Sequence, residues 1–349
     1  MTPQRLDAIN YANAALMVAS CVAAFLLPFE LFLFVYAVLG PLHYLTQISW
    51  LHDRDYFVPR GRKPWLLLVG LTTVVLVAAY LSDVVLHDRV DAKYEVGLVW
   101  LVFLTAAMLF VVRQRASAIA LILVTTIAVA IASSSRVYLI AAYFLVTIVH
   151  VFLFTALFVL YGAVKSRSRS AYLSLAVYAA CAISFFVIHP SIAPAAEAIR
   201  KTYSFFEPLN MQLMSLFGFA PADLYASRGG IVVMRLIAFA YTYHYLNWFS
   251  KTSIIRWHDV SKKRAAAIAA LWAASVGVYA YDYGAGIAVL YLLSMLHVLL
   301  EFPLDHQTLA GVGRALIGRS DDRGGRSGSS SRPGPRGSLP ANARATRSA

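Results

Sequence analysis

The sequence predicts an all-α protein, a polytopic transmembrane helical bundle of about ten spans with both termini in the cytoplasm. Of its 349 residues, 60% are hydrophobic and 13% are charged, and this charged fraction is about half that of an average soluble domain. Apolar runs long enough to cross a membrane recur from the N-terminus to residue 301. A soluble fold is excluded, because it would have to bury every run with almost no polar surface to cover them.

The predicted spans follow one another at short intervals. A helix that crosses the bilayer needs about 20 mostly apolar residues. Segments of this kind lie at residues 9–27, 29–51, 64–82, 96–112, 118–134, 137–162, 171–189, 229–248, 265–282 and 284–301. The apolar run from Asn10 to Leu51 is too long for one helix, and Pro28 and Glu30 predict a tight turn between its two spans.

The loops between the spans alternate in charge. Those after the second, fourth, sixth and eighth spans are basic and read HDRDYFVPRGRK, RQR, KSRSR and SKTSIIRWHDVSKKR. Those after the third and seventh are mixed or acidic, and the others are short with at most one basic residue, Arg136. Basic loops remain in the cytoplasm, so the even-numbered spans all run from outside to inside. The chain is therefore expected to be a multi-pass protein of the inner, cytoplasmic membrane, surrounded by membrane lipids.

The chain divides into one predicted domain and one tail. Residues 1–310 form a single transmembrane helical domain, and residues 311–349, rich in Gly, Ser, Pro and Arg, form a disordered basic cytoplasmic tail. The external segment at residues 190–228 is aromatic and amphipathic, which favours packing along the membrane interface over a lid. The net charge of +13 follows from the tail and the basic loops and predicts no nucleic-acid partner. Cys21 and Cys181 lie in apolar segments and are expected to be reduced packing residues.

Four of the nine histidines lie inside predicted spans at one depth. His43, His150, His244 and His297 belong to the second, sixth, eighth and tenth spans, which all run in the same direction. Each lies about 13 to 15 residues from the outer end of its helix, or about 20 Å at the helical rise per residue. The four side chains are therefore expected in one plane, in the cytoplasmic half of the bilayer.

Polar side chains stand three or four positions from each of these histidines, on the same helical face. They are Thr46 and Gln47 beside His43, Thr147 beside His150, Tyr241 and Asn247 beside His244, and Ser294 and Glu301 beside His297. A single histidine in a membrane helix is usually a packing or hydrogen-bonding residue. Four at one depth, each with a polar partner to fix its tautomer, favour a shared metal site.

The histidine pattern indicates which kinds of metal site the chain could form. Imidazole binds iron, zinc and copper. One histidine on each of four helices differs from the paired layers that hold b-type haems, and the spaced boxes HxxxH and HxxHH are absent. A second ion would need His52, His258 and His306, which lie about two turns or more closer to the cytoplasm.

One positive charge lies within the eighth span. Arg235 is nine residues before His244, about 180° round the helix, so it is expected to face away from the histidines. It is expected either to extend outward to the membrane interface or to pair with Glu30.

Each of the four histidines sits in a short motif. These are LGPLHYLTQ for His43, TIVHVF for His150, AYTYHYLNW for His244 and SMLHVLLEF for His297. Over residues 39–302, their order and depth resemble those of the Brp/Blh family of membrane β-carotene dioxygenases. Gln47 stands where the first family motif has Asp, and one histidine stands where the third has two. The resemblance implies one ferrous ion, dioxygen as co-substrate and an apolar substrate.

Together these features predict an intramembrane non-haem metal oxygenase. The expected cofactor is Fe(2+), held by His43, His150, His244 and His297. The expected substrate is lipid-soluble, such as a carotenoid, an isoprenoid or a fatty chain, delivered through the bilayer with dioxygen. The residues expected to support the chemistry are Glu301, Gln47, Asn247 and Tyr241. A multi-pass transporter and a non-catalytic metal-bearing membrane assembly protein are the alternatives, although the chain shows no internal repeat of the kind transporters have.

Overall fold

In a computed structural model, helices are the only regular structure of the residues that are described. These are residues 2–58, 64–82, 92–111, 145–191, 195–220 and 222–324, and at some of their helix ends only the backbone is described. The predicted all-α class holds throughout this part of the chain. The predicted fifth span, residues 118–134, and the start of the sixth lie outside it.

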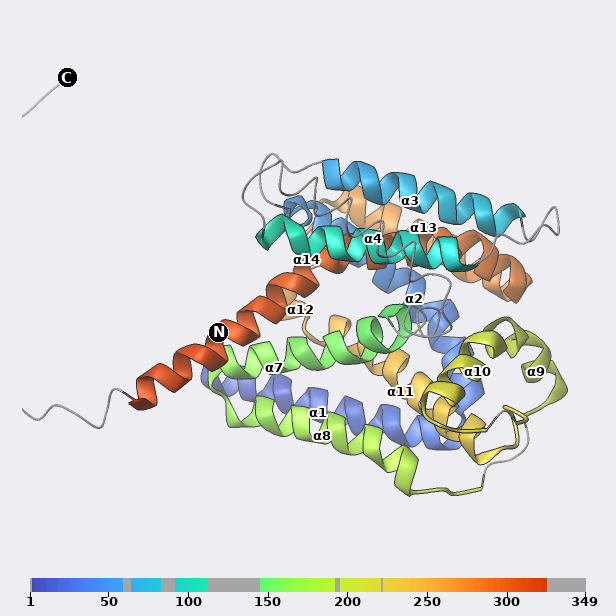
Figure 1. Ribbon diagram of the computed structural model, residues 1–349, viewed down its shortest axis with the longest axis horizontal. Helices are drawn as coiled ribbons and strands as arrows, with labels where there is room; N and C mark the ends of the chain where they lie inside the picture. Colours follow the sequence, from blue (N-terminus) through green and yellow to red (C-terminus); the bar gives the residue numbers. More distant parts are fainter. Residues whose placement is uncertain are drawn as a thin grey trace, which may run out of the picture.

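The bundle is built from helices that lie largely side by side (Figure 1). In chain order the described helices are α1 (Pro3–Leu26), α2 (Pro28–His52), η1 (Asp55–Phe57), α3 (Pro64–Leu81), α4 (Ala92–Val111), η3 (Leu145–Phe154), α7 (Thr155–Ser166), α8 (Arg169–Val187), α9 (Glu197–Tyr203), η4 (Ser204–Phe206), α10 (Glu207–Leu216), α11 (Arg228–Ser250), α12 (Thr252–Ile255), α13 (Lys262–Tyr281) and α14 (Tyr283–Gly324). Figure 1 shows α9 and α10 gathered at one end of the bundle, while the last part of α14 projects beyond the opposite end.

Several helices begin at residues that suit a first turn. Pro28 is the first residue of α2, where its missing N–H costs no hydrogen bond, and the break at Leu27 is the turn expected between the first two spans. Ser168, Ser227 and Ser261 precede α8, α11 and α13, and each side chain accepts a hydrogen bond from the backbone N–H three residues later. These helix starts are therefore encoded locally in the sequence.

α11 lies at the centre of the bundle, packed against α1, α2, α8, α10 and η3. Most of its residues between Gly229 and Trp248 are buried. Its start lies so close to the preceding turn that a Cβ atom at Gly230 would stand 2.1 Å from the carbonyl oxygen of Leu224. The position therefore accepts only a residue without a side chain.

Apolar side chains cover the outside of the bundle as well as its interior. Leu67 and Val74 on α3, Ile183 on α8 and Val289 on α14 are between 61% and 66% exposed. Large exposed apolar side chains on several faces are unfavourable in water and favourable in lipid. The outer faces of the bundle therefore suit a membrane.

Six of the described helices are long and apolar enough to cross a membrane. They are α1, α2, the helix Ile148–Ser166, α8, α13 and the segment Tyr283–Ala315 of α14, and α3 and α4 contain shorter apolar stretches. α11 falls at the predicted eighth span but is not among the six. Because other helices surround α11, it needs no apolar lipid-facing side and carries polar residues instead. By length and composition the described part of the chain thus suits a helical membrane protein, and it contains six qualifying helices, whereas ten spans are predicted for the whole chain.

Contacts along helix pairs reveal the relative directions of the helices. Between α2 and α11 the contacts advance together, from Phe32 with Tyr241 to Thr46 with Trp248. Contacts between α2 and α14 also advance together, from Leu33 with Tyr283 to Tyr44 with His297. Those between η3–α7 and α14 advance from His150 with Glu301 to Tyr161 with Gly311. α1 runs opposite to α11. The helices that carry the four buried histidines are therefore parallel, as the alternation of loop charges predicts.

The segment predicted to pack along the interface does pack on the bundle. It contains α9, η4 and α10, and these helices contact α2 and α11. Tyr203 and Asn210 in this segment are fully buried. At the other end, α14 continues to Gly324 and so passes the predicted boundary between bundle and tail at residue 310. Residues 325–349 of the predicted tail lie outside the described part of the chain.

Cys21 and Cys181 lie in the contact between α1 and α8, where both are buried and free. The Cys181 thiol donates to the carbonyl oxygen of Met17 at 3.9 Å, and the Cys21 sulfur lies 3.7 Å from the hydroxyl of Ser184. Both side chains serve as small packing residues, as the sequence predicted.

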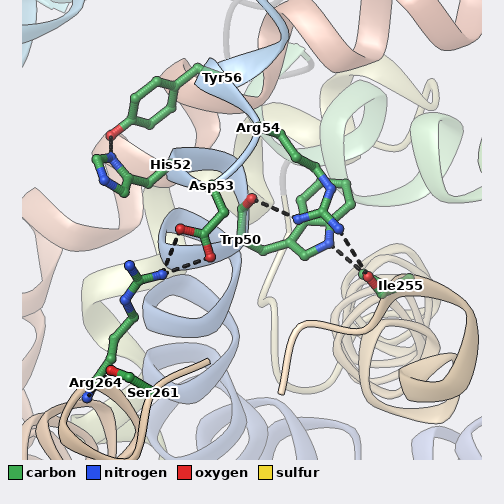
Figure 2. Close-up of polar contacts among 8 residues, drawn as sticks. All are labelled: Trp50, His52, Asp53, Arg54, Tyr56, Ile255, Ser261 and Arg264. Carbon is green, nitrogen blue, oxygen red and sulfur yellow. Dashed lines mark hydrogen bonds and ion pairs between the residues drawn. The ribbon is translucent and has the colours of Figure 1, made fainter. Parts of the chain in front are cut away.

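Charged side chains tie the end of α2 to the start of α13 (Figure 2). Arg264 donates to the two carboxylate oxygens of Asp53 at 2.7 and 2.6 Å, and this hydrogen bonding lowers the pKa of Asp53. Arg54 donates to the carbonyl oxygens of Trp50, in the last turn of α2, and of Ile255. A basic side chain is favourable at the carboxyl end of a helix. These contacts fix the end of the bundle that is predicted to face the cytoplasm.

Gly230→Ala is expected to destabilise the bundle by about 1–3 kcal/mol, because the new methyl group would overlap the Leu224 carbonyl. Thermal unfolding of the purified protein in detergent measures the effect. Gly277→Ala in α13 is the matched control, since an added Cβ there meets nothing within 4 Å, and it should leave stability unchanged or raise it. Equal melting temperatures for the two variants would contradict the close approach at α11.

Candidate functional site

Four parallel helices bring the four predicted histidines together. His43 on α2, His150 on η3, His244 on α11 and His297 on α14 are all buried. Going round the group, neighbouring ring centroids are 4.8, 5.5, 5.6 and 5.6 Å apart. Rings that share one tetrahedral ion stand about 5 Å apart, given metal–nitrogen bonds of about 2.0–2.1 Å. We refer to these residues as the four-histidine cluster.

The helices are irregular beside the cluster. Pro41 lies inside α2, two residues before His43, and removes one backbone hydrogen bond from the helix. His150 lies in the π-helical segment η3. Internal prolines and π-helical turns shift side chains out of the regular helical register, and π-bulges are frequent at functional sites. Both histidines therefore stand where the backbone departs from an ideal helix.

The nitrogen atoms of the cluster converge only in part. Nε2 of His43 and Nε2 of His244 are 3.2 Å apart, the separation of two ligands at about 2.1 Å from one ion with an angle of about 100° between them. In the described residues, however, no group of three or more His, Cys, Asp or Glu side chains is arranged to hold a metal ion as the side chains stand. The ring spacing suits a shared ion, whereas the side chains in their present orientations do not complete a ligand set.

Thr155 contacts the ring of His244. Its hydroxyl oxygen lies 2.7 Å from the carbonyl oxygen of Val151 and 2.9 Å from Nδ1 of His244. If the hydroxyl donates to Val151, its oxygen accepts from Nδ1–H, and Nε2 of the neutral ring then presents a lone pair towards His43. A metal ligand needs this arrangement, with the second nitrogen held by a hydrogen bond.

Two buried carboxylates lie beside His150. Oε2 of Glu301 is 3.6 Å from Nε2 of His150, and Oδ2 of Asp305 is 3.9 Å from its Nδ1. Glu301 and Asp305 are 3% and 0% exposed, and His150 is their only ion-pair partner among the described residues. The sequence analysis predicts Glu301 but not Asp305, because the predicted tenth span ends at residue 301. The interval of four from His297 to Glu301 and again to Asp305, on one helical face, is the signal that identifies it.

Buried polar atoms without a hydrogen-bond partner concentrate at this place. Among the described residues they include Nδ1 of His43 and His297, both ring nitrogens of His150, Oε1 of Gln47, Oε2 of Glu301 and both carboxylate oxygens of Asp305. Each such atom costs about 1–3 kcal/mol, and folded proteins contain few of them. A concentration of them inside one bundle fits a site built for a metal ion and its bound water.

Two tyrosines that the sequence interpretation missed complete the site. Tyr44 stacks on His297, with ring centroids 4.1 Å apart and an angle of 23° between the planes. Its hydroxyl is 2.8 Å from that of Tyr245, whose ring centroid lies 5.2 Å from that of His43. Each tyrosine directly follows a histidine of the cluster. This repeated His-Tyr pair is the signal that points to them.

The four-histidine cluster separates two environments along the bundle. The two tyrosine hydroxyls lie against Gly40, one turn before His43. Glu301 and Asp305 come one and two turns after the histidine of α14. Because α2 and α14 are parallel, the phenols and the carboxylates lie on opposite sides of the cluster.

The predicted partners on α2 lie at the site. Gln47 is buried and its side chain lies near that of Glu301, so it belongs to the carboxylate side of the cluster. Thr46 accepts a hydrogen bond from Nε1 of Trp248 at 3.0 Å and donates to the backbone within α2. It therefore fastens α2 to α11 beside His43. The side chain of Thr147, predicted beside His150, lies outside the described part of the structure.

The predicted partners on α11 have their contacts elsewhere. The ring of Tyr241 packs against Phe32 and Tyr36, with centroids 5.2 and 6.1 Å apart, in an aromatic group on the phenol side of the cluster. Oδ1 of Asn247 accepts a hydrogen bond from the hydroxyl of Tyr243 at 3.3 Å. The contacts of Asn247 thus tie it to a neighbouring turn of α11.

The three histidines considered for a second ion lie apart from the cluster. His52 is 3.2 Å from the hydroxyl of Tyr56 (Figure 2). Nε2 of His306 donates to the carbonyl oxygen of Phe103 at 2.9 Å. His258 packs against the neighbouring ring of Trp257. Each has a structural contact of its own, and the described residues give no second group of ligands around them.

Comparison of the chain with protein-family models, with curated proteins and with solved structures finds no match. The candidate site therefore stands on its own geometry: four buried imidazoles, two buried carboxylates and a pair of phenols, all contributed by α2, η3, α11 and α14.

Asp305→Asn is expected to stabilise protein that has been treated with a chelator, by about 1–3 kcal/mol, because it replaces a buried carboxylate whose oxygens have no hydrogen-bond partner. The melting temperature in detergent measures this. Asp7→Asn is the control, since Oδ1 of Asp7 accepts hydrogen bonds from Ser168 and Ser170 at 3.0 and 2.5 Å, and it should lower stability. If both variants lose stability to the same extent, the Asp305 carboxylate is satisfied without a ligand.

Proposed function

We propose that this chain is an intramembrane non-haem iron oxygenase that acts on a lipid-soluble substrate. Fe(2+) would be held by His43, His150, His244 and His297. Bound there, the ion would supply the means to activate dioxygen, which the protein side chains alone lack. The observation that carries the proposal is the convergence of the four rings, on four separate helices, at the spacing of ligands around one ion.

The charges around the cluster support a divalent cation. Two carboxylates buried beside one imidazole are unfavourable unless positive charge or protons balance them. Fe(2+) would balance Glu301 and Asp305, and Gln47 is near enough to Glu301 to help hold it in place. Thr155 would keep the ring of His244 oriented with its lone pair towards the site.

The phenol side of the cluster suits an apolar substrate. Tyr44 and Tyr245 line the cluster there, and the rings of Phe32, Tyr36 and Tyr241 continue away from it. Aromatic rings pack well against conjugated or aliphatic chains. The hydrogen-bonded phenol pair would also orient a polar group of the substrate. A carotenoid, an isoprenoid or a fatty chain fits this chemistry and could enter from the bilayer.

A proton-coupled transporter is a second candidate, because one observation favours it. Glu301, His150 and Asp305 form a row of buried titratable groups, and such rows conduct protons in membrane transporters. The two functions differ in metal content, since a proton pathway needs no bound iron.

Purified protein is expected to hold about one iron per chain, as measured by elemental analysis of folded, monodisperse protein in detergent. His43→Ala, His244→Ala and His297→Ala should abolish this metal. Thr155→Val should weaken metal binding about 10- to 100-fold, because the tautomer of His244 is no longer held. His306→Ala is the matched control on α14, since its ring bonds to Phe103, and it should retain the metal. Wild-type protein without stoichiometric transition metal would favour the proton pathway.

Turnover is tested separately from metal binding. Proteoliposomes containing a host lipid extract, supplied with isotope-labelled dioxygen, should yield a labelled apolar product with the wild type and none with His297→Ala. Metal without any labelled product would leave the chain a metal-bearing assembly protein. Tyr44→Phe should retain metal and lose turnover if its hydroxyl positions the substrate.

The proposal includes ten spans with both termini in the cytoplasm of the inner membrane. Reporter fusions after Arg115, Ser170 and Lys263 should therefore report the cytoplasm, and fusions near Asp91 and Glu207 the exterior. The parallel course of the described histidine helices supports this arrangement. One reversed report would break the alternation and with it the proposed topology.

A further inference from the structure

We propose that a pocket at the end of the bundle where α11 begins binds a phosphate group, carried by a lipid headgroup or free in solution. The inference is independent of the proposed oxygenase activity. The pocket lies at the end where α9 and α10 gather (Figure 1), which the loop charges predict to be the outer side of the membrane.

The pocket is a cavity of about 540 Å³, within the usual size range of small-molecule sites. Arg200 from α9 and Arg228 and Arg235 from α11 line it, together with His189 and Tyr225. None of the described residues that line it is acidic. Three guanidinium groups thus surround one cavity without a carboxylate among its walls.

Arg235 is the most unusual of the three. It is 1% exposed, so it does not extend outward to the interface, and the ion pairs of the described residues do not include the alternative pairing with Glu30. Its guanidinium donates to the carbonyl oxygens of Pro190 and Phe25 at 2.8 and 3.3 Å and lies 5.0 Å above the ring of Phe25. Its Nε has no partner among the described residues. Carbonyl groups and an aromatic ring hold the side chain in place but do not neutralise its charge.

The other two arginines lie at the rim of the pocket, where each contacts a neighbouring side chain. Arg228 lies 2.7 Å from Nε2 of His189. Arg200 lies 4.8 Å above the ring of Tyr225. It also lies 4.0 Å from a carboxylate oxygen of Asp223, and the side chains of Arg200 and Asp223 are both partly exposed to solvent. Surface ion pairs of this kind contribute little, so Asp223 compensates for at most one of the three positive charges.

A phosphate group matches these donors. Arginine forks bind phosphate oxygens through paired, charge-assisted hydrogen bonds, and several forks can share one tetrahedral anion. The amino end of α11, which begins at Arg228, adds the positive end of its helix dipole. The remaining volume accommodates the glycerol part of a lipid.

The pocket and the four-histidine cluster are separate sites on one helix. Arg235 and His244 are nine residues apart on α11, which is about 13 Å along the axis and on opposite faces. A phosphate at Arg235 would therefore contact none of the four histidines of the cluster. Its binding should be unaffected by the loss of iron.

Isothermal titration calorimetry on the full chain in a neutral detergent tests the proposal with three probes. Short-chain phosphatidylglycerol carries a phosphate and two tails, dioctanoylglycerol carries the tails alone, and inorganic phosphate carries the anion alone. Saturable binding of phosphatidylglycerol, without binding of dioctanoylglycerol, supports a headgroup site. Binding of inorganic phosphate that displaces the lipid supports a site for the free anion as well. Binding of neither phosphate-containing probe, or equal binding of the two lipids, overturns the proposal.

Variants at the rim assign the binding to this pocket. Arg228→Gln and Arg200→Gln are expected to weaken phosphate-probe binding at least about tenfold, while leaving the melting temperature close to that of the wild type because both side chains are partly exposed. Arg256→Gln, an exposed arginine at the opposite end of the bundle, is the control and should bind like the wild type. Unchanged affinity in both rim variants, or an equal loss in the control, overturns the assignment. Chelator-treated wild type should bind as tightly as untreated protein, which separates this site from the iron site.

Discussion

The cost of placing polar groups inside an apolar bundle governs the centre of this structure. His43, His150, His244 and His297 and two carboxylates lie at a depth where water is scarce, and each loses hydration free energy unless it finds a partner. The fold supplies some partners, such as the Thr155 hydroxyl for His244. Several ring and carboxylate atoms nevertheless have no hydrogen-bond partner in the described structure. The bundle gathers these atoms in one region, where we propose that a single ion satisfies several of them.

That arrangement depends on the parallel course of the contributing helices. The helices α2, η3–α7, α11 and α14 run in the same direction, so equal depth along the sequence becomes equal height in the bundle. An antiparallel helix would carry a histidine at this depth to a different height. Local irregularities then adjust the rings, since Pro41 interrupts α2 just before His43 and His150 lies in a π-helical segment. The direction of each helix sets the height of its histidine in the bundle, and the local backbone sets the orientation of the ring.

α11 shows how the central position of a helix changes what its sequence can contain. Surrounded by α1, α2, α8 and η3, it has no lipid-facing side and can present polar groups on two faces. His244 faces the four-histidine cluster, and Arg235 faces the pocket at the other end. Both are nearly inaccessible to solvent. The same burial that keeps α11 from resembling a typical spanning helix makes it the element that connects the two candidate sites.

Within the described part of the chain, the sequence by itself determined the helical class, the parallel course of the histidine helices and the common depth of the histidines. The length of an apolar run indicates which segment crosses the membrane, prolines and serine caps indicate where a helix begins, and loop charge indicates its direction. Each of these features can be read from the sequence alone. The tertiary structure decided which side chains meet. Asp305, Tyr44 and Tyr245 belong to the site, while the contacts of Asn247 and Tyr241 lie beside it. The periodicity of one helix fixes the face on which a residue lies but not the neighbour that this face meets. That neighbour depends on lateral packing and on helix rotation, which are set by the summed contacts of all the helices.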